Sequence, residues 1–419
     1  ERALAEQGRG ACSHVAFALV DPDGFREVND TMGRVGGDEV MRAIAARLKE
    51  LLPAAALLGR FEDDEFAVVA GGNDAGLADA LAAALRAAFA APLGGDRAQQ
   101  ISAAIGVVQA PEDGASADDM IRRAALTIDA AKHDGRGVTR RFVPQIETDQ
   151  AEHRFLLREL KAAIAAQAFH VHYQPIVAAA RGSVLGVEAL LRWTHAERGD
   201  IAPSIFIPLA EQHGLMHGLG EFVLRRALAD PARRPELFVA VNLSVRQFGD
   251  GKLVAEVQSE LAQSGLRPEQ LELEVTESML IDNTQTVGDQ LAALKALGVS
   301  IAMDDFGTGY SSLGYLWQFR FDKLKIDRSF VTALETDEKR AREILDTIIV
   351  LGHKLDMTIT AEGIETERQA RVLVTLGCDH VQGYLYGRPA SASELGAFLL
   401  RNREIRPDAV PEPAHTAAG

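Results

Sequence analysis

The sequence predicts an α/β protein in which a smaller α+β domain is followed by a TIM-like (β/α)8 barrel. Its 419 residues are enough for two or three domains. In residues 1–143, strand-like runs alternate with helical segments on the scale of one ordinary domain. In residues 152–402, eight apolar runs each end in a polar group, as a barrel with a site at the carboxyl ends of its strands requires. We assign residues 144–151 to a linker and the Pro- and Ala-rich residues 403–419 to a disordered tail.

The composition is that of a soluble globular protein with an acidic balance. Hydrophobic residues make up 47% of the chain, charged residues make up 25%, and the net charge is -16. This charge argues against a nucleic-acid polymer as partner. A small anionic ligand would need metal ions or a few well-placed cations in order to bind.

The sequence also bounds the cellular setting. Cys12 and Cys378 lie far apart and show no metal-ligand spacing, so we expect no disulfide and a reducing, cytoplasmic environment. No apolar run approaches ~20 residues without a charge, so we expect neither a membrane contact nor a signal peptide in these residues. Because the sequence starts at Glu1 without an initiator Met, we interpret it as part of a longer protein with an upstream sensor or membrane segment.

The first domain is predicted from alternating strand and helix patterns. Its expected elements are, in order, a strand at 15–21, a helix at 38–52, strands at 55–59 and 66–70, a helix at 75–91, a strand at 101–108, a helix at 118–132 and a strand at 138–142.

Three segments of this domain carry polar motifs. Residues 21–30 read Asp-Pro-Asp-Gly-Phe-Arg-Glu-Val-Asn-Asp, Gly37 precedes Asp38, and residues 131–136 read Ala-Lys-His-Asp-Gly-Arg. In these segments the chain resembles the GGDEF family of diguanylate cyclases. The resemblance covers nearly the whole domain, although the family's opening D-x-L-T-G-L-x-N-R element is absent.

The resemblance implies a GTP site. Asp21 and Glu65 would hold a metal ion, and Asn29 and Asp38 would read guanine. Lys132 and Arg136 would contact the phosphates, and Phe25 would complete the site. The structural alternative is that Asp38 caps a helix and that Lys132 and Arg136 are solvated charges near a helix C-terminus.

The family signature itself is altered. Where the family has Gly-Gly-Asp-Glu-Phe, this chain has Glu62-Asp63-Asp64-Glu65-Phe66. Glycines in such a hairpin let the backbone approach a nucleotide, and two acids there add bulk and negative charge beside a triphosphate. We therefore expect no cyclase activity. The family's inhibitory R-x-x-D site falls at residues 53–56, which read Pro-Ala-Ala-Ala, so we expect no product inhibition there.

In the second domain the polar groups at the ends of the eight apolar runs define a candidate site. In chain order they are Gln174-Pro175, Glu188 with Arg192, Asn242 with Ser244, Glu274 with Glu277, Asp304-Asp305, Lys325 with Asp327, Glu362 with Glu365, and Gln382-Gly383. Any one of these could be a cap or a salt-bridge partner. Together they indicate a single polar face at the carboxyl ends of barrel strands.

These residue types suit divalent metal ions. Glu188, Asn242, Glu274 and Asp304 are oxygen ligands for Mg²⁺ or Mn²⁺, without a Cys or His cluster that would favour zinc. A second ion would be held by Asp304, Asp305 and Glu362. Two such ions suit in-line attack of water on a phosphodiester. Lys325 would orient the water or neutralise charge on phosphorus, and Glu362 would position the water.

The second domain resembles the EAL family of cyclic di-GMP phosphodiesterases. The motifs that carry the resemblance are Glu-Ala-Leu-Leu-Arg-Trp at 188–193, Ile-Phe-Ile-Pro-Leu-Ala-Glu at 205–211, Val-Asn-Leu-Ser at 241–244, Glu-Val-Thr-Glu at 274–277, Asp-Asp-Phe-Gly-Thr-Gly at 304–309, Lys-Ile-Asp at 325–327, Ala-Glu-Gly-Ile-Glu at 361–365 and Gln-Gly-Tyr at 382–384. The chain resembles the family at every position where the family places a catalytic group.

The resemblance implies hydrolysis of cyclic di-GMP to linear pGpG by two metal ions. The catalytic residues would be Glu362, Lys325, Asp305 and Glu277, with Glu277 anchoring the loop at 304–313. The dinucleotide would contact Gln174, Pro175, Leu190, Arg192, Gln382 and Glu365. The same loop and the helix after it would form a homodimer contact.

Two other functions stay open at this point. A silent cyclic di-GMP receptor would signal by conformational change, although such receptors usually lose metal ligands that are present here. A cyclase is disfavoured by Glu62 and Asp63. The first domain would then regulate the second, with GTP as the ligand it senses.

Overall fold

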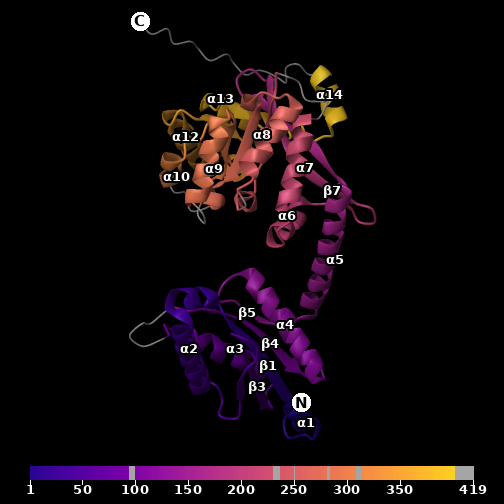
Figure 1. The fold of residues 1–419 in the computed structure, drawn as a ribbon, viewed down its shortest axis with the longest axis vertical. Helices are drawn as coiled ribbons and strands as arrows, with labels where there is room; N and C mark the ends of the chain where they lie inside the picture. The colour runs from indigo at the N-terminus through magenta and orange to yellow at the C-terminus, as the bar shows by residue number, and fades with distance from the viewer. Residues whose placement is uncertain (94–99, 230–235, 250, 281–283, 308–312, 402–419) are drawn as a thin grey trace. The chain divides into compact units, whose positions relative to one another are not determined.

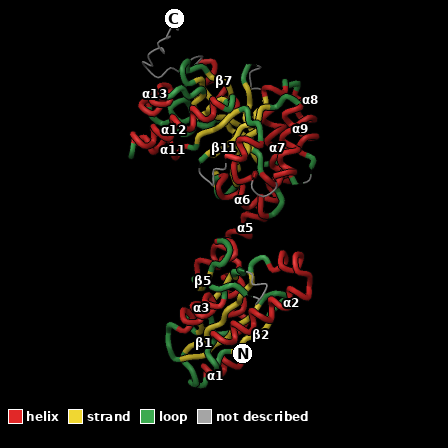
Figure 2. Tube along the Cα trace, turned by 90° about the vertical axis from the view of Figure 1, so that its left-hand side faces the viewer, coloured by secondary structure: helices red, strands yellow, loops and turns green. Residues whose placement is uncertain are grey.

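The chain forms two compact units, Glu1–Leu156 and Leu157–Gly419, each described here by itself (Figure 1). The computed structural model describes residues 1–93, 100–229, 236–249, 251–280, 284–307 and 313–401. The tail predicted at 403–419 lies outside these residues. Figure 2 distinguishes the strands, in yellow, from the helices, in red.

The first unit is an α+β domain around a mostly antiparallel sheet. Its elements are α1 (Arg2–Gly8), β1 (His14–Pro22), α2 (Phe25–Leu51), β2 (Leu57–Arg60), β3 (Phe66–Gly72), α3 (Leu77–Ala88), β4 (Ala103–Ala110), α4 (Ala117–Asp134), β5 (Thr139–Arg141) and the first part of α5 (Pro144–Ala166). The strand order is β2-β3-β1-β4-β5, with only β4 and β5 parallel among the described pairings.

Strand β1 lies at the centre of this sheet and is buried on both faces. Ala16 and Ala18 belong to one core, which also contains residues of α2 and α3. Phe17 and Leu19 belong to the other core, which contains residues of α4. Because successive side chains of a strand point to opposite faces, a continuous apolar run is what a strand between two helical layers needs.

Helix α2 begins earlier than the sequence predicts. It runs from Phe25 instead of residue 38, and Gly33 interrupts it with φ 71° and ψ 169°. The sequence pattern predicts no helix in residues 25–37, because the turns before Gly33 bury only Phe25 and Val28. Asp38 therefore lies inside the helix, and the alternative that it is an N-cap is wrong.

The predicted linker at 144–151 lies within helix α5, so our interpretation of an irregular junction is corrected. The helix begins at Pro144, the first residue of the predicted linker. Proline is well tolerated at the first position of a helix, where its missing N–H would have no partner.

The second unit is a barrel of strands surrounded by helices. Its elements after α5 are β6 (Phe169–Ala178), β7 (Val184–His195), β8 (Gly199–Ile201), α6 (Pro203–Gln212), α7 (Met216–Ala229), β9 (Phe238–Asn242), α8 (Leu253–Ser264), β10 (Leu271–Thr276), α9 (Thr284–Ala296), β11 (Ser300–Phe306), α10 (Leu313–Gln318), β12 (Lys323–Ile326), α11 (Arg328–Thr332), α12 (Glu338–Lys354), β13 (Thr358–Ala361), α13 (Glu367–Thr375), β14 (His380–Val381) and α14 (Ala392–Arg401).

Each of the eight predicted apolar runs forms a strand, but the barrel is not a regular (β/α)8 repeat. The strands β7, β9, β10, β11, β12, β13 and β14 are parallel neighbours in that order. Strand β6 closes the ring between β14 and β7 and is antiparallel to both. Alternation of apolar residues does not encode strand direction, and the short connection from β6 to β7 has no room for a crossover helix.

The reversed strand changes how one predicted site residue reaches the site. The carboxyl end of β6 lies at the opposite end of the barrel from those of its neighbours. Gln174, however, lies in mid-strand and is in register with Glu188 of β7. It therefore points to the same end of the barrel as the other candidates.

Among the helices that the structure describes, there is no candidate for a membrane span.

Candidate active site

Acidic side chains from three parts of the barrel converge on Lys325. Its Nζ lies 2.8 Å from Oε1 of Glu274, 3.2 Å from Oδ1 of Asp304 and 2.6 Å from Oε1 of Glu362. These carboxylates come from β10, β11 and the residue after β13, while Lys325 belongs to β12. The lysine side chain is 1% exposed. A buried ammonium is tolerated when it is paired, so the ion pairs hold the ends of these strands together.

Glu188 of β7 is held by two side-chain amides. Its Oε1 accepts a hydrogen bond of 2.7 Å from Nδ2 of Asn242, and its Oε2 accepts one of 2.6 Å from Nε2 of Gln382. The same Gln382 nitrogen donates to Oε1 of Gln174 at 3.2 Å, and Nε2 of Gln174 donates to the carbonyl of Gly387 at 3.1 Å. This network fixes the orientation of Glu188 beside the Lys325 cluster.

The two adjacent aspartates of β11 are separated by a backbone irregularity. The pairing of β11 with β12 shifts between Met303 and Phe306, and Asp305 has φ 54°. A positive φ costs energy in a residue other than glycine, so it is uncommon outside turns and functional sites. The amide of Asp305 donates to Oδ1 of Asp304 at 2.9 Å. Adjacent side chains of a regular strand point to opposite faces, so this break changes where the Asp305 carboxylate lies relative to that of Asp304.

The protonation of the cluster follows from its burial. Burial raises the pKa of Glu274 well above its usual range, although the charge of Lys325 opposes the shift. Burial also raises the pKa of Glu362 to about 8. Burial alone would lower the pKa of Lys325, but Asp304 and the other carboxylates raise it well above its usual value. The lysine therefore stays cationic, and burial favours the protonated forms of Glu274 and Glu362.

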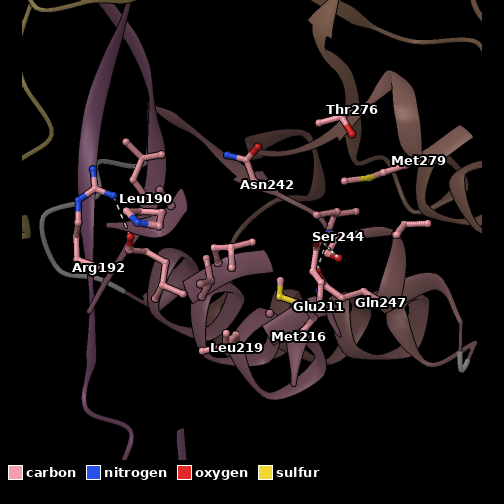
Figure 3. A pocket seen from close by; sticks show the side chains of 18 residues that line it. Leu190, Arg192, Glu211, Met216, Leu219, Asn242, Ser244, Gln247, Thr276 and Met279 are labelled. Carbon is pink, nitrogen blue, oxygen red and sulfur yellow. Dashed lines mark hydrogen bonds between the residues drawn. The ribbon is translucent and has the colours of Figure 1, made fainter. Parts of the chain in front are cut away.

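A cleft of about 730 Å³ opens beside these groups. The predicted site residues that line it are Gln174, Glu188, Leu190, Glu362, Glu365 and Gln382. A second, mostly apolar cavity of about 520 Å³ adjoins it through Leu190 and is also lined by Arg192 and Asn242 (Figure 3). Pro175 and Glu277 are among the predicted residues that line neither cavity. Pro175 is buried and packs against Gly387, where an added Cβ would lie 3.1 Å from the proline ring. Glu277 is buried at the start of the 3₁₀ helix Glu277–Leu280.

Residues 308–312 of the loop that Glu277 is predicted to anchor, at 304–313, lie outside the described residues, so that role stays a prediction.

In the first unit, Lys132 stands between the two predicted metal ligands. Its Nζ forms an ion pair with Oδ2 of Asp21 and lies 3.8 Å from Oε1 of Glu65. The lysine comes from the last turn of α4, Asp21 from β1, and Glu65 from the hairpin between β2 and β3. The lysine is thus paired with acids and is not a solvated helix-end charge. Arg136 is more exposed and lies 3.4 Å from Glu27.

The predicted guanine-reading residues lie on α2, on either side of its break. Asn29 packs against Gly37 so closely that a Cβ there would lie 2.0 Å from Oδ1 of Asn29 and 3.3 Å from the Phe25 ring. Asp38 is exposed and lines a cleft of about 480 Å³ with Arg60 and Phe66 of the signature hairpin. The structure therefore brings Lys132 together with Asp21 and Glu65, and Asp38 to a cleft beside the signature hairpin.

Comparison with known proteins decides the family. Residues 157–389 match the EAL domain family, which is more than half of the chain. The chain belongs to the EAL family. Residues 1–138 match the GGDEF domain of diguanylate cyclases, so the chain is a tandem GGDEF–EAL protein.

Two curated relatives and one solved structure illustrate the relationship. The cyclic di-GMP phosphodiesterase NbdA of Pseudomonas aeruginosa is 37% identical over 403 residues, which cover 95% of this chain and 51% of NbdA. The bifunctional diguanylate cyclase and phosphodiesterase MucR of the same organism is 38% identical over 390 residues, covering 92% of this chain and 57% of MucR. The solved structure of the PaMucR phosphodiesterase in complex with c-di-GMP is 43% identical, with a TM-score of 0.55, and covers 57% of this chain and 99% of that one.

The chain spans about half the length of the curated relatives that it matches first.

The acidic side chains of the EAL domain are of the type that binds divalent cations, but in the structure their carboxylates contact the Lys325 ammonium. Across the described parts of the chain, no group of three or more His, Cys, Asp or Glu side chains is already placed to hold a metal ion. The acids that gather there are Glu188, Glu274, Asp304, Asp305 and Glu362, against the single lysine. Oε2 of Glu274 is buried and has no hydrogen-bond partner among the described residues. The donor set therefore fits hard cations, and the predicted ligands stay a prediction.

We expect the affinity of the EAL domain for Mn²⁺ to rise with pH. The pKa of Glu362 is raised to about 8, so below that pH a proton occupies the carboxylate that is predicted to hold the second ion. Displacing one proton makes the affinity about tenfold stronger per pH unit below about pH 8, and nearly constant above it. Calorimetric titration with Mn²⁺ across this range measures the slope. Glu362→Gln should flatten it, and a flat profile in the unmodified chain would contradict proton competition.

Some residues of the cleft were not identified from the sequence. Arg328, Ser329 and Tyr384 line it, from α11 and from the loop after β14. The signal for the first two was their position directly after the Lys325–Asp327 motif. In the second cavity, Oε1 of Glu211 accepts a hydrogen bond of 2.7 Å from Oγ of Ser244 (Figure 3).

Proposed function

We propose that the protein is a cyclic di-GMP-specific phosphodiesterase that hydrolyses cyclic di-GMP to linear pGpG. The observation that carries this proposal is the Lys325 cluster, in which three carboxylates surround one buried ammonium beside Glu188 at the wall of a ligand-sized cleft. The matches to NbdA and to the PaMucR phosphodiesterase support the choice of substrate.

Two divalent cations, Mg²⁺ or Mn²⁺, complete the proposed site. Glu188, Asn242, Glu274 and Asp304 would hold one ion, and Asp304 with Asp305 and Glu362 would hold the other. When bound, such ions neutralise charge on the phosphodiester and favour ionisation of water. Binding requires Lys325 to give up part of its contact with these carboxylates.

The chain's own residues supply the remaining steps. The amides of Gln174 and Gln382 bind and orient the dinucleotide in the cleft, and Arg192 contacts it from the adjoining cavity. The Glu362 carboxylate, in its ionised form, takes a proton from the water that attacks phosphorus; an O–P bond forms and the P–O3′ bond breaks. The proton then passes to the 3′ oxygen, which leaves as a hydroxyl. Lys325 stays cationic and stabilises the charge that builds up on the phosphoryl oxygens.

The GGDEF domain is proposed to be a regulator that does not make cyclic di-GMP. Glu62 and Asp63 replace the glycines of the signature and add negative charge where a triphosphate would lie. The ion pair of Lys132 with Asp21, the nearby Glu65, and the cleft that Asp38 lines with Phe66 support a retained nucleotide site. GTP is the ligand proposed for this site, and a homodimer through the EAL domain is proposed around Trp317 of α10, which is 85% exposed.

Turnover of cyclic di-GMP by the purified chain, followed by chromatography of the products, tests the proposal. We expect pGpG with Mg²⁺ or Mn²⁺, little product after chelation, and faster turnover when GTP is added. Turnover that ignores GTP would overturn the regulatory role and leave the phosphodiesterase intact. Binding of cyclic di-GMP without any turnover would contradict the enzyme and favour a silent receptor.

A further inference from the structure

A second buried lysine–glutamate pair lies deeper in the barrel. Nζ of Lys323 lies 2.5 Å from Oε2 of Glu272, and the two side chains are 6% and 4% exposed. Lys323 precedes Lys325 by two residues on β12, and Glu272 precedes Glu274 by two residues on β10. Because alternate residues of a strand point to the same face, both pairs point into the barrel. We call Glu272 and Lys323 the lower pair, and Glu274 and Lys325 the upper pair. Each pair joins a carboxylate of β10 to an ammonium of β12, at its own level along the barrel axis.

The lower pair is made across a strand that carries a small residue. Strand β11 lies between β10 and β12, and it places Ala302 in register with Glu274 on one side and with Lys323 on the other. Ala302 is fully buried. Its methyl group leaves space for the lysine to pass over β11 and reach Glu272. The register also puts Lys323 level with Glu274, so the two are alternative partners.

Aromatic rings support the lower lysine. Nζ of Lys323 lies 4.0 Å from the centre of the Phe238 ring, which stacks on His380 at 6.3 Å. Burial lowers the pKa of His380 to about 4, so this ring is neutral at pH 7. The lower level therefore holds one positive and one negative charge, whereas acids outnumber the lysine in the upper level.

A buried ion pair in a barrel interior carries a desolvation penalty for both charges. Branched apolar side chains usually occupy this position, and they avoid the desolvation of two charges. Oε1 of Glu272 is also buried without a hydrogen-bond partner in the part of the chain that the structure describes. The pair is therefore better explained by an effect on its neighbours than by its own stability.

We infer that Glu272 and Lys323 are positioning residues which, by pairing with each other, keep Glu272 from competing for Lys325 and keep Lys323 from competing for Glu274. The inference rests on the proposed function, because Glu274 is there a metal ligand and Lys325 acts in turnover. It assigns the lower pair no contact with substrate or metal.

The two single substitutions should have different consequences. Lys323→Met leaves the Glu272 carboxylate without its ammonium partner, so this carboxylate attracts Lys325 away from Asp304. Every proposed metal ligand stays available. Glu272→Gln leaves the Lys323 ammonium beside Glu274, where it competes with a metal ion. A pair with a merely structural role would lower stability and metal affinity together in both variants.

Mn²⁺ affinity of the intact chain, measured by electron paramagnetic resonance of the free ion, tests this inference. We expect Glu272→Gln to weaken binding about tenfold, and Lys323→Met to leave it within about twofold. We expect kcat for cyclic di-GMP to fall about tenfold in Lys323→Met. The double variant should recover both Mn²⁺ affinity and kcat, because it leaves no unpaired charge at positions 272 and 323. Equal losses of Mn²⁺ affinity in both single variants, or no recovery in the double variant, would overturn the inference.

Two further variants keep the test decisive. Lys323→Arg retains the charge and should match the unmodified chain, and losses like those of Lys323→Met would refute charge pairing as the cause. Lys323→Gln replaces the Met variant if that variant does not fold. Lys295→Met is the matched control, because it breaks a more exposed pair with Asp322, 2.6 Å apart, and should change nothing at the site. If the unmodified chain fails to hydrolyse cyclic di-GMP, the proposed function fails while the Mn²⁺ affinities still decide this inference.

Discussion

Replacing Lys325 by methionine should lower kcat by about 10² to 10³ and destabilise the metal-free protein by about 3–5 kcal/mol. The lysine is the cation shared by Glu274, Asp304 and Glu362, and its side chain is 1% exposed. Without it, these carboxylates must take up protons or repel one another in a buried site. The same change removes the charge that would stabilise the phosphoryl oxygens during attack.

Metal ions should reverse part of the loss of stability but not the loss of turnover. Mn²⁺ supplies positive charge to the same carboxylates, so it should raise the unfolding temperature of Lys325→Met more than that of the unmodified chain. Thermal unfolding with and without Mn²⁺, together with steady-state kinetics, measures both effects. Lys339→Met, at an exposed position of α12, is the control and should match the unmodified chain. Normal turnover by the Lys325 variant would show that the lysine has no part in the chemistry.

The sequence was sufficient to predict which strands contribute to the site, because each apolar run ends in a polar residue and parallel strands bring such ends together. It did not contain the direction of β6, whose apolar pattern is the same in either orientation. The backbone turn at Asp305 also follows from tertiary pairing, since the adjacent aspartates give no sign of a shift in register.

The lower barrel pair shows why some inward residues were overlooked. In residues 271–276, leucine and valine alternate with acids, which is the pattern of a strand with one face in water. In the barrel the order is reversed. The apolar residues of β10 face the surrounding helices, while Glu272 and Glu274 face inward and meet lysines of β12. Period alone identifies the two faces of a strand, but only closure of the barrel decides which of them is the interior.

Substituting Glu188 should abolish turnover of cyclic di-GMP. Its carboxylate is held by Asn242 and Gln382, so Glu188→Gln changes the charge while nearly keeping the volume. We expect Mn²⁺ affinity to fall by about 10² and kcat by at least about 10³, because an amide replaces a charged metal ligand and one of the two neighbouring donors loses its acceptor.

The outcome separates the proposed enzyme from its alternatives. In a silent receptor, Glu188→Gln would alter binding of cyclic di-GMP but would have no turnover to abolish. If the first domain were the active one, a nucleotide product would form from GTP, and its rate would not depend on Glu188, which belongs to the other unit. Glu343→Gln, at an exposed position of α12, is the matched control for loss of one carboxylate. Turnover at the unmodified rate in the Glu188 variant would place the chemistry elsewhere than among the acids at the carboxyl ends of the barrel strands.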